Sequence, residues 1–203
     1  MPTTMSTTQP AAVSSTEAPL RLAVILGSVR EGRFGPTVGH WFAERAAERA
    51  DMTVDLVDLA DPGHTLPLAM GGGEGAAVTA RLAAAEAFAV VTPEYNHSYP
   101  AALKNVIDWH RDEWFAKPVG FVSYGGISGG LRAVEHLRAV FAELHAVTVR
   151  DTVSFHNAGG QFDADGRPAD PAGCGGAASA MLDQLAWWGS ALRGARAARP
   201  YAA

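Results

Sequence analysis

The feature that most constrains the fold is a regular alternation of short apolar runs with longer segments of helical periodicity, starting near Arg21. This alternation is typical of βαβ units, in which helices join parallel strands. The runs expected to form strands are Arg21–Leu26, Met52–Leu59, Phe88–Thr92, Pro118–Ser123 and a segment within Ala146–Phe155. The segments expected to form helices are Pro36–Arg49, Glu74–Ala87, Pro100–His110, Gly129–His145 and Ala177–Ala198. The pattern predicts an α/β fold with a doubly wound, five-stranded parallel sheet covered by helices on both faces.

Two segments depart from this regular pattern. Most runs are nearly continuous in apolar residues, as expected of buried central strands. Met52–Leu59 instead alternates apolar residues with Asp55 and Asp58, which favours an edge strand. The segment Asn157–Gly176 is dense in Gly, Asp and Pro, so we expect a mobile surface loop there.

Composition limits the partners and the compartment. The chain has 203 residues, with 16 Lys and Arg against 21 Asp and Glu, so no basic surface is expected to hold nucleic acid or an anionic membrane. Residues 20–203 are expected to form one domain, after a disordered tail at residues 1–19 that lacks the features of a signal peptide. The single cysteine, Cys174, cannot form an internal disulfide, which fits a reducing cytoplasm. We therefore expect a soluble cytoplasmic protein.

The loop after the first predicted strand has the composition of an anion site. It contains Gly27, Gly32 and Gly35 together with Ser28, and it leads directly into a predicted helix. Backbone N–H groups at a helix N-terminus, with a hydroxyl and the guanidinium groups of two arginines, suit a phosphate monoester. The glycine spacing matches neither a dinucleotide-binding nor an NTPase loop. The alternative is an ordinary glycine-rich turn with exposed arginines.

Two further loops follow the third and fourth predicted strands. The first, Thr92–Pro100, is stiffened by a proline near each end and suits contact with a flat ring. Its alternative is a rigid turn in which Ser98 caps the next helix. The second, Ser123–Gly130, contains four glycines and allows close backbone approach to a ligand, although such a loop can also serve only as a connection. In a sheet of order 2-1-3-4-5, all three loops adjoin the crevice where ligands bind.

One stretch of the sequence carries a family resemblance. It consists of Pro93-Glu94-Tyr95-Asn96, followed by Ser98, Pro100 and Leu103-Lys104-Asn105-Val106-Ile107-Asp108-Trp109. This stretch resembles the Pro-Glu-Tyr-Asn loop and following helix of NAD(P)H-dependent FMN reductases with a flavodoxin-like fold, a family that includes quinone, azo-dye and chromate reductases. The likeness extends from about Arg21 to about Phe155.

The resemblance implies a cofactor and a set of binding residues. FMN would bind with its phosphate at the first loop and its isoalloxazine along the second, and NADPH or NADH would donate electrons. The cofactor-binding residues expected are Ser28, Arg30, Arg33, Phe34, Gly35, Pro36, Pro93, Glu94, Tyr95, Asn96, Ser123, Tyr124, Gly125 and Gly126. Many members carry Ser at the position of Arg33 and Asn at that of Gly35, so Arg33 is a candidate for the missing phosphate donors. Relatives are commonly dimers or tetramers, so a homodimer or homotetramer is expected.

Function follows from this set of expectations. Hydride chemistry belongs to the flavin, so no catalytic side chain and no metal are required. Backbone amides near Glu94–Asn96 are candidates to moderate charge on the flavin, and His97 is either near the ring or an ordinary surface residue. Lys104 and Asp108, four residues apart on a helix, are expected to form an ion pair. The expected activity is ping-pong electron transfer to a small acceptor such as a quinone; the alternatives are a flavodoxin-like electron carrier and a flavin-binding sensor.

Overall fold

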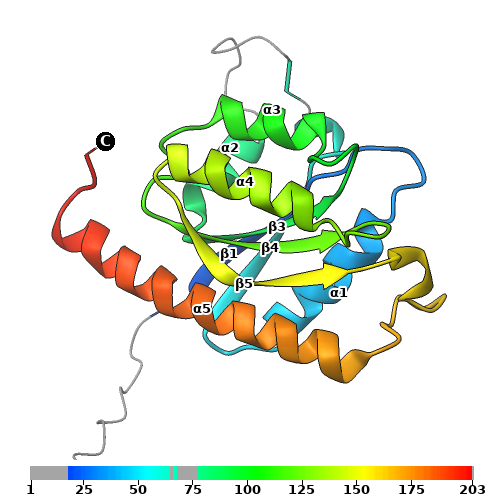
Figure 1. The fold of residues 1–203 in the computed structure, drawn as a ribbon. Helices are drawn as coiled ribbons and strands as arrows, with labels where there is room; N and C mark the ends of the chain where they lie inside the picture. Colours follow the sequence, from blue (N-terminus) through cyan, green and yellow to red (C-terminus); the bar gives the residue numbers. More distant parts are fainter. Residues whose placement is uncertain (1–17, 65, 68–76, 203) are drawn as a thin grey trace, which may run out of the picture.

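The computed structural model describes residues 18–64, 66–67 and 77–202. Five parallel strands form a sheet of order β2-β1-β3-β4-β5 (Figure 1). The strands are β1 (Leu20–Leu26), β2 (Met52–Asp58), β3 (Ala87–Pro93), β4 (Pro118–Tyr124) and β5 (Val147–Phe155). Each predicted strand is present, in the order expected of a flavodoxin-like fold.

Helices cover both faces of the sheet, as predicted (Figure 1). They are α1 (Gly35–Ala47), α2 (Ala77–Ala84), α3 (Ala101–Trp109), α4 (Leu131–Glu143) and α5 (Pro171–Ala198), with 3₁₀ turns at η1 (Pro62–His64) and η2 (Ala158–Gly160). The first residues of the predicted helix Glu74–Ala87 lie outside the described residues. Helices α1 and α5 pack on one face, and α2, α3 and α4 pack on the other.

Side chains of β1 show why the strand sequences are continuously apolar. Leu22, Val24 and Leu26 point into the core beneath α1 and α5, whereas Ala23 and Ile25 point into the core beneath α2, α3 and α4. All five are at most 1% exposed. Full burial of such an aliphatic side chain contributes about 1.5–3 kcal/mol, so the two cores together hold the sheet between its helices.

The two edge strands differ from the three central ones. Every residue of β3 and β4 is buried, whereas β2 alternates between buried and exposed positions, as Asp55 and Asp58 predicted. Strand β5 is the second edge, and Arg150 on it is exposed. The expectation of a buried central strand within Ala146–Phe155 was therefore wrong, because no strand covers its outer side.

The segment Asn157–Gly176 is a loop only as far as Asp170, and the prediction was wrong for its last six residues, which are helical. Helix α5 begins at Pro171, and the Asp170 carboxylate caps it by accepting the Gly173 N–H at 2.9 Å. Phe162 packs against Phe155, with 4.8 Å between ring centroids, and against Trp41. The helix cap and this aromatic packing offset the low helix propensity of the glycines.

The N-terminal region is described only in part. Residues 1–17 of the predicted tail lie outside the described residues. The carbonyl of Ala18 accepts a hydrogen bond from Arg193 at 3.0 Å, so the described chain is already in contact with α5 before β1 begins. Of the helices in the described ranges, none combines the length and hydropathy needed to cross a membrane.

Candidate functional site

Three loops meet at the carboxyl ends of β1, β3 and β4, which are neighbours in the sheet. We call them loop 1 (residues 27–34), loop 2 (residues 94–100) and loop 3 (residues 125–130). Loop 1 runs into α1, whose N-terminus carries Pro36 in its first turn and no side-chain cap, with Phe34 at the N-cap position. Backbone N–H groups at such an uncapped N-terminus can donate to an anion. The predicted anion site is therefore built on a helix that supplies backbone donors.

Loops 1 and 2 are joined by two contacts of Tyr95. The Ser28 hydroxyl lies 2.7 Å from the Tyr95 hydroxyl, and Ser28 is 1% exposed. The guanidinium carbon of Arg30 lies 3.6 Å from the centre of the Tyr95 ring, a cation–π arrangement. The two predicted phosphate-binding residues thus lie beside the tyrosine of the Pro-Glu-Tyr-Asn motif.

Arg33 joins loop 1 to the end of β2. Its Nη1 and Nη2 each donate to one carboxylate oxygen of Asp58 at 2.6 Å, and Nη1 also donates to the Ser28 carbonyl at 2.6 Å. Burial alone would raise the pKa of Asp58, but the Arg33 guanidinium holds it below its usual value. Asp58 was not among the predicted site residues. Its position at the carboxyl end of the strand next to β1 could have indicated that it lies near loop 1.

Gly35 lies against the tyrosine that ends β4. A Cβ at position 35 would lie 2.9 Å from the Tyr124 hydroxyl, so the Asn that many family members carry would require Tyr124 to shift. Tyr124 is 6% exposed, and burial raises its pKa, so its phenol stays protonated at neutral pH. Phe34 packs edge-on against Tyr124 and Phe162. Phe34, Tyr124 and Phe162 thus form an aromatic cluster that packs at the start of α1.

Loop 2 is a tight hairpin. Tyr95 and Ser98 exchange backbone hydrogen bonds of 2.8 and 3.0 Å, and between them Asn96 and His97 both have positive φ. This is the geometry of a two-residue type I′ turn, which Asn tolerates well. Both residues are exposed.

Two expectations about loop 2 change with this geometry. The amides of Glu94 and Tyr95 donate to the carbonyls of Tyr124 and Ser98, so these two are not free to bond a flavin. Ser98 does not cap α3, which has Pro100 at its N-cap position and no side-chain cap; its hydroxyl lies 3.1 Å from Nδ1 of His136. The groups that these roles needed are engaged elsewhere: the Glu94 amide by β4, the Tyr95 amide within the hairpin and the Ser98 hydroxyl by His136 of α4.

Glu94 clamps loop 2 to loop 3 and α4. Its side chain is 8% exposed and accepts hydrogen bonds from the Ser128 hydroxyl, from the Arg132 amide at 3.2 Å and from the Arg132 guanidinium at 3.0 Å. Burial would raise the pKa of Glu94, but these donors lower it, so the group is a carboxylate at neutral pH. The carboxylate of Glu94 is therefore bonded to Ser128 and Arg132 of the protein. Ser128 and Arg132 are partners that the sequence did not identify.

Four side chains hold loop 3 in place. The hydroxyls of Ser123 and Ser154 donate to the Gly129 carbonyl at 2.8 and 2.9 Å, and Nδ1 of His156 donates to the Ile127 carbonyl at 2.9 Å. Glu94 is the fourth of these side chains, and it holds loop 3 through the Ser128 hydroxyl. Ser123 is fully buried, so its hydroxyl serves the loop. The Ile127 side chain, by contrast, is 83% exposed.

The backbone of loop 3 is also tied to the end of β5. The amides of Asn157 and Ala158 donate to the carbonyls of Gly126 and Gly125 at 2.9 and 3.0 Å. The Gly125 amide donates to the Phe155 carbonyl at 3.2 Å. Gly126 is exposed, and a Cβ there would meet no atom within 4 Å, so its backbone is open to a ligand on that side.

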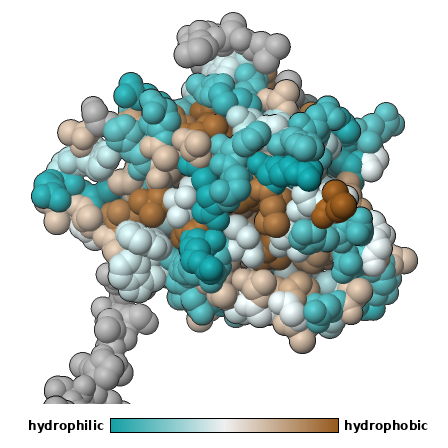
Figure 2. Space-filling view, viewed as in Figure 1, coloured by the Kyte–Doolittle hydropathy of each residue, from teal (hydrophilic) through white to brown (hydrophobic). Residues whose placement is uncertain are grey.

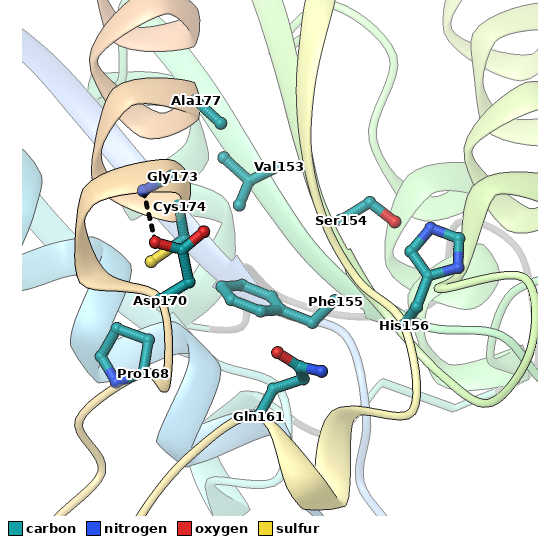
Figure 3. Close-up of a pocket in the computed structure, with 10 residues that line it drawn as sticks. All are labelled: Val153, Ser154, Phe155, His156, Gln161, Pro168, Asp170, Gly173, Cys174 and Ala177. Atoms are coloured by element: carbon teal, nitrogen blue, oxygen red, sulfur yellow. Dashed lines mark hydrogen bonds between the residues drawn. The ribbon is translucent and has the colours of Figure 1, made fainter.

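Two hollows lie next to these loops. One of about 280 Å³ is bordered by Val29 of loop 1, His64 and Asn105. The other, of about 350 Å³, lies between the end of β5 and the start of α5 (Figure 3). Cys174 borders the second hollow; burial and the nearby Asp170 raise the pKa of its thiol, so it is not a reactive thiolate.

The surface and the donor set indicate the type of ligand. On the face drawn in Figure 2 the surface is mainly hydrophilic, with apolar side chains in separate small patches. The described residues include no cluster of His, Cys, Asp and Glu fit to bind a metal. An uncapped helix N-terminus with the guanidinium of Arg30, next to Tyr95 and the open backbone at Gly126, suits a phosphate attached to a flat ring.

Comparisons with known proteins identify the family of the chain. The chain matches the family described as NADPH-dependent FMN reductase over residues 20–160. An NAD(P)H-dependent FMN reductase of Schizosaccharomyces pombe is 36% identical over 124 residues, which cover 54% of this chain and 60% of that protein. A probable NADPH:quinone oxidoreductase of Oryza sativa subsp. japonica is 32% identical over 169 residues, covering 78% of this chain and 83% of the relative.

A solved structure supports the fold. FerB, a flavoenzyme NAD(P)H:(acceptor) oxidoreductase from Paracoccus denitrificans, superposes with a TM-score of 0.67 over 85% of this chain and 98% of its own, at 21% identity. The family match covers more than half of the 203 residues and includes all three loops. The chain therefore belongs to the NADPH-dependent FMN reductase family.

Proposed function

We propose that this protein is an NAD(P)H-dependent, FMN-containing oxidoreductase that passes electrons to a small acceptor such as a quinone. The observation that carries the proposal is the meeting of three loops at one edge of the sheet, where an uncapped helix N-terminus, an arginine and an aromatic ring lie together. FMN, when bound, supplies the hydride chemistry. The protein's own part is to hold the cofactor, orient its ring and leave one ring face open to substrates.

Each loop has a separate role in this proposal. Ser28, Arg30 and the N–H of Gly35 would hold the phosphate, while Pro36, which has no N–H, would shape the first turn of α1. Pro93–Asn96 would lie along the ring. Gly126 would approach the ligand through its open backbone, and Gly125, whose amide donates to Phe155, would shape the loop. Phe34 and Tyr124 would support the phosphate end by packing, and Ser123 would support loop 3. The Ser28 hydroxyl is held by the phenols of Tyr95 and Tyr124, and a phosphate would add to or replace one of these two contacts.

Turnover would follow a ping-pong course, with NADPH or NADH and then the acceptor using the same open ring face. No side chain has to act as nucleophile or acid in this scheme. The names of the relatives, an FMN reductase and a quinone oxidoreductase, favour this activity over electron carriage between proteins.

The protein would act as a homodimer or homotetramer in the cytoplasm. Trp187 and Trp188 on α5 form an edge-on pair and are 65% and 37% exposed, which offers apolar surface for a second copy. Trp114, in contrast, is fully buried and belongs to the core. A free Cys174 suits a reducing compartment.

The test combines a spectrum with turnover. The purified protein, alone or after addition of FMN, should absorb in the visible range as a flavoprotein and should quench FMN fluorescence. It should then oxidise NADPH or NADH steadily when a quinone is present. A protein that binds no FMN would overturn the proposal. One that binds FMN without oxidising NAD(P)H would instead be a carrier or a sensor.

A further inference from the structure

The bidentate ion pair between Arg33 and Asp58 has a role of its own at loop 1. We propose that Arg33 sets cofactor affinity through Asp58, as a positioning residue that fixes loop 1, and that it is not a ligand of the phosphate. This inference rests on the proposed function, because it concerns how the same site holds FMN. It also adds Asp58, a residue of β2, to the residues on which the site depends.

Most of the donor capacity of Arg33 is already in use. A guanidinium has five N–H groups. Three of them are engaged, two by the carboxylate oxygens of Asp58 and one by the Ser28 carbonyl, each at 2.6 Å. The side chains of Arg33 and Asp58 are only 16% and 19% exposed, so water competes weakly for these bonds. To reach a phosphate with its full fork, Arg33 would have to leave Asp58 half-buried and unpaired.

These contacts fix Ser28 from two directions. Arg33 holds its carbonyl and Tyr95 holds its hydroxyl, while the preceding amide, that of Gly27, donates to the Val91 carbonyl at 2.9 Å. Asp58 is itself oriented, because it accepts the Ala60 amide at 3.0 Å. A continuous chain of hydrogen bonds thus runs from the end of β2 to Ser28, the residue proposed to hold the phosphate.

The pair also sets the charge of loop 1. The pKa of Arg33 is raised, chiefly by its bond to Asp58, and that of Asp58 is held low, so both groups are charged at neutral pH. Their charges offset each other. The remaining charges of loop 1 are those of Arg30 and Glu31, and the guanidinium of Arg30, which contacts the Tyr95 ring, is not paired with an acid in the described contacts.

The substitution Asp58→Asn separates the two possible roles of Arg33 by the sign of its effect. If Arg33 were a phosphate ligand, the substitution would free its guanidinium and remove a negative charge near the phosphate, so FMN would bind more tightly. If Arg33 is a positioning residue, the bidentate bond is broken and FMN should bind about tenfold more weakly, the size expected for a charge-assisted bond. The expected loss has to exceed the opposing effect of charge, which makes the test stringent.

Asp55→Asn is the matched control. Asp55 lies on the same strand and forms its own bidentate pair with Arg81 of α2, so the substitution makes the same change of charge and breaks the same kind of pair. Its side chain contacts no residue of loop 1 among the described hydrogen bonds. It should leave FMN affinity unchanged, and any thermal destabilisation that it causes calibrates that of Asp58→Asn.

The experiment measures the dissociation constants of FMN and riboflavin by fluorescence quenching. Wild type, Asp58→Asn, Asp55→Asn, Arg33→Ala, Arg33→Lys and the double variant Arg33→Ala/Asp58→Asn are compared, with thermal unfolding as the check of folding. We expect Asp58→Asn, Arg33→Ala and the double variant all to weaken FMN binding. Arg33→Ala should weaken it most, because it leaves the Asp58 carboxylate unpaired and removes the bond to the Ser28 carbonyl, and the two single effects should not add in the double variant, because each breaks the same pair. Riboflavin, which has no phosphate, should change little. Arg33→Lys should also weaken FMN binding, because an ammonium lacks the planar fork.

Two results would overturn the inference. The first is tighter or unchanged FMN binding by Asp58→Asn while Arg33→Ala weakens it. The second is full retention of FMN affinity in Arg33→Lys, which would make charge sufficient. Failure of the wild-type protein to bind FMN at all would refute the proposed function instead, so the two failures are distinguishable.

Discussion

The hydroxyls of Ser28 and Tyr95 lie 2.7 Å apart and join loop 1 to loop 2 across the candidate site. Ser28 is 1% exposed, so this bond takes the place of water for its hydroxyl. The family resemblance assigned both residues to the cofactor, but it did not indicate that they contact each other. The contact means that the phosphate end and the ring end of the site are built as one unit.

Tyr95→Phe should therefore destabilise the protein. It removes one of the two phenol partners of the buried Ser28 hydroxyl, the other being Tyr124, so the expected cost is that of one hydrogen bond, about 0.5–1.5 kcal/mol. Urea unfolding at neutral pH measures the loss. Tyr201→Phe is the control, because Tyr201 also bonds through its hydroxyl, to His145 at 2.7 Å, but is 48% exposed. An equally small effect of both substitutions would mean that the Ser28 contact does not stabilise the fold.

Glu94→Gln should weaken the clamp between loops 2 and 3. The amide keeps the size of the side chain but loses the charge that pairs with Arg132, and the expected loss is about 1–3 kcal/mol at neutral pH. Because the folded pKa is lowered, the stabilisation is present above the unfolded pKa, about 4.3, and is lost as pH falls through the folded pKa.

Chemical unfolding of wild type and Glu94→Gln at neutral and acidic pH checks this. The difference in the free energy of unfolding should shrink at low pH. Glu135→Gln is the control, since Glu135 pairs with Arg138 on the same helix but is 73% exposed. A difference that stays constant with pH would show that the charge of Glu94 does not carry the clamp.

The sheet was predictable from the sequence because its signal is local. Apolar runs of β-branched residues mark the five strands, and the acidic residues Asp55 and Asp58 marked an edge. The ion pair between Lys104 and Asp108, confirmed at 2.6 Å, also follows from a spacing within one helix. Such patterns need no knowledge of which elements meet.

The contacts that shape the site could not be predicted in this way. Arg33 and Asp58 are 25 residues apart, and Glu94 and Arg132 are 38 apart, so no local pattern links either pair. The start of α5 was missed for a related reason. Its glycines oppose a helix, and the Asp170 cap and the packing of Phe162 that outweigh them are tertiary features.

Ile127 should contribute to binding of apolar acceptors. Its backbone is fixed by His156, its neighbour Ser128 bonds Glu94 of loop 2, and its side chain is 83% exposed at the edge of the site. Ile127→Ala removes apolar contact area, so kcat/KM for a naphthoquinone should fall by about fivefold, the effect of roughly 1 kcal/mol. FMN affinity and thermal stability should not change.

The control acceptor is ferricyanide, which is hydrophilic and offers no apolar surface. Its reduction by Ile127→Ala should match that of the wild type. Equal loss with both acceptors, or weaker FMN binding, would place the role of Ile127 at the cofactor and not at the acceptor.

Lys117 should make stability rise with pH in the alkaline range. Its ammonium donates to the carbonyls of Leu82 and Ala83 at 3.2 and 3.3 Å, near the end of α2. Burial and the positive charge of Arg196 lower its pKa to about 8, although Glu86 acts in the opposite direction. Between this value and the unfolded pKa, about 10.4, the unfolded chain keeps a proton that the folded protein sheds.

The comparison is between wild type and Lys117→Met at about pH 7 and about pH 9.5. The wild type should gain about 2 kcal/mol relative to the variant across this range, because the cost of burying the charge disappears as Lys117 loses its proton. A neutral amine can still donate to both carbonyls, so the helix end keeps its partners. If the difference between the two proteins does not depend on pH, Lys117 titrates at its ordinary value.

Arg30→Ala should reduce the affinity for FMN and spare that for riboflavin. The guanidinium lies over the Tyr95 ring, in the loop that precedes α1, where the phosphate is proposed to bind. Loss of a charge-assisted hydrogen bond costs about 1.5–3 kcal/mol, so FMN should bind about ten- to a hundredfold more weakly. Turnover at saturating FMN should persist, because a phosphate contact positions the cofactor without touching the path of the hydride. If titration shows that Arg30→Ala loses affinity for both flavins alike, the arginine acts by holding Tyr95 in place, and the phosphate is bound by the N-terminus of α1 without it.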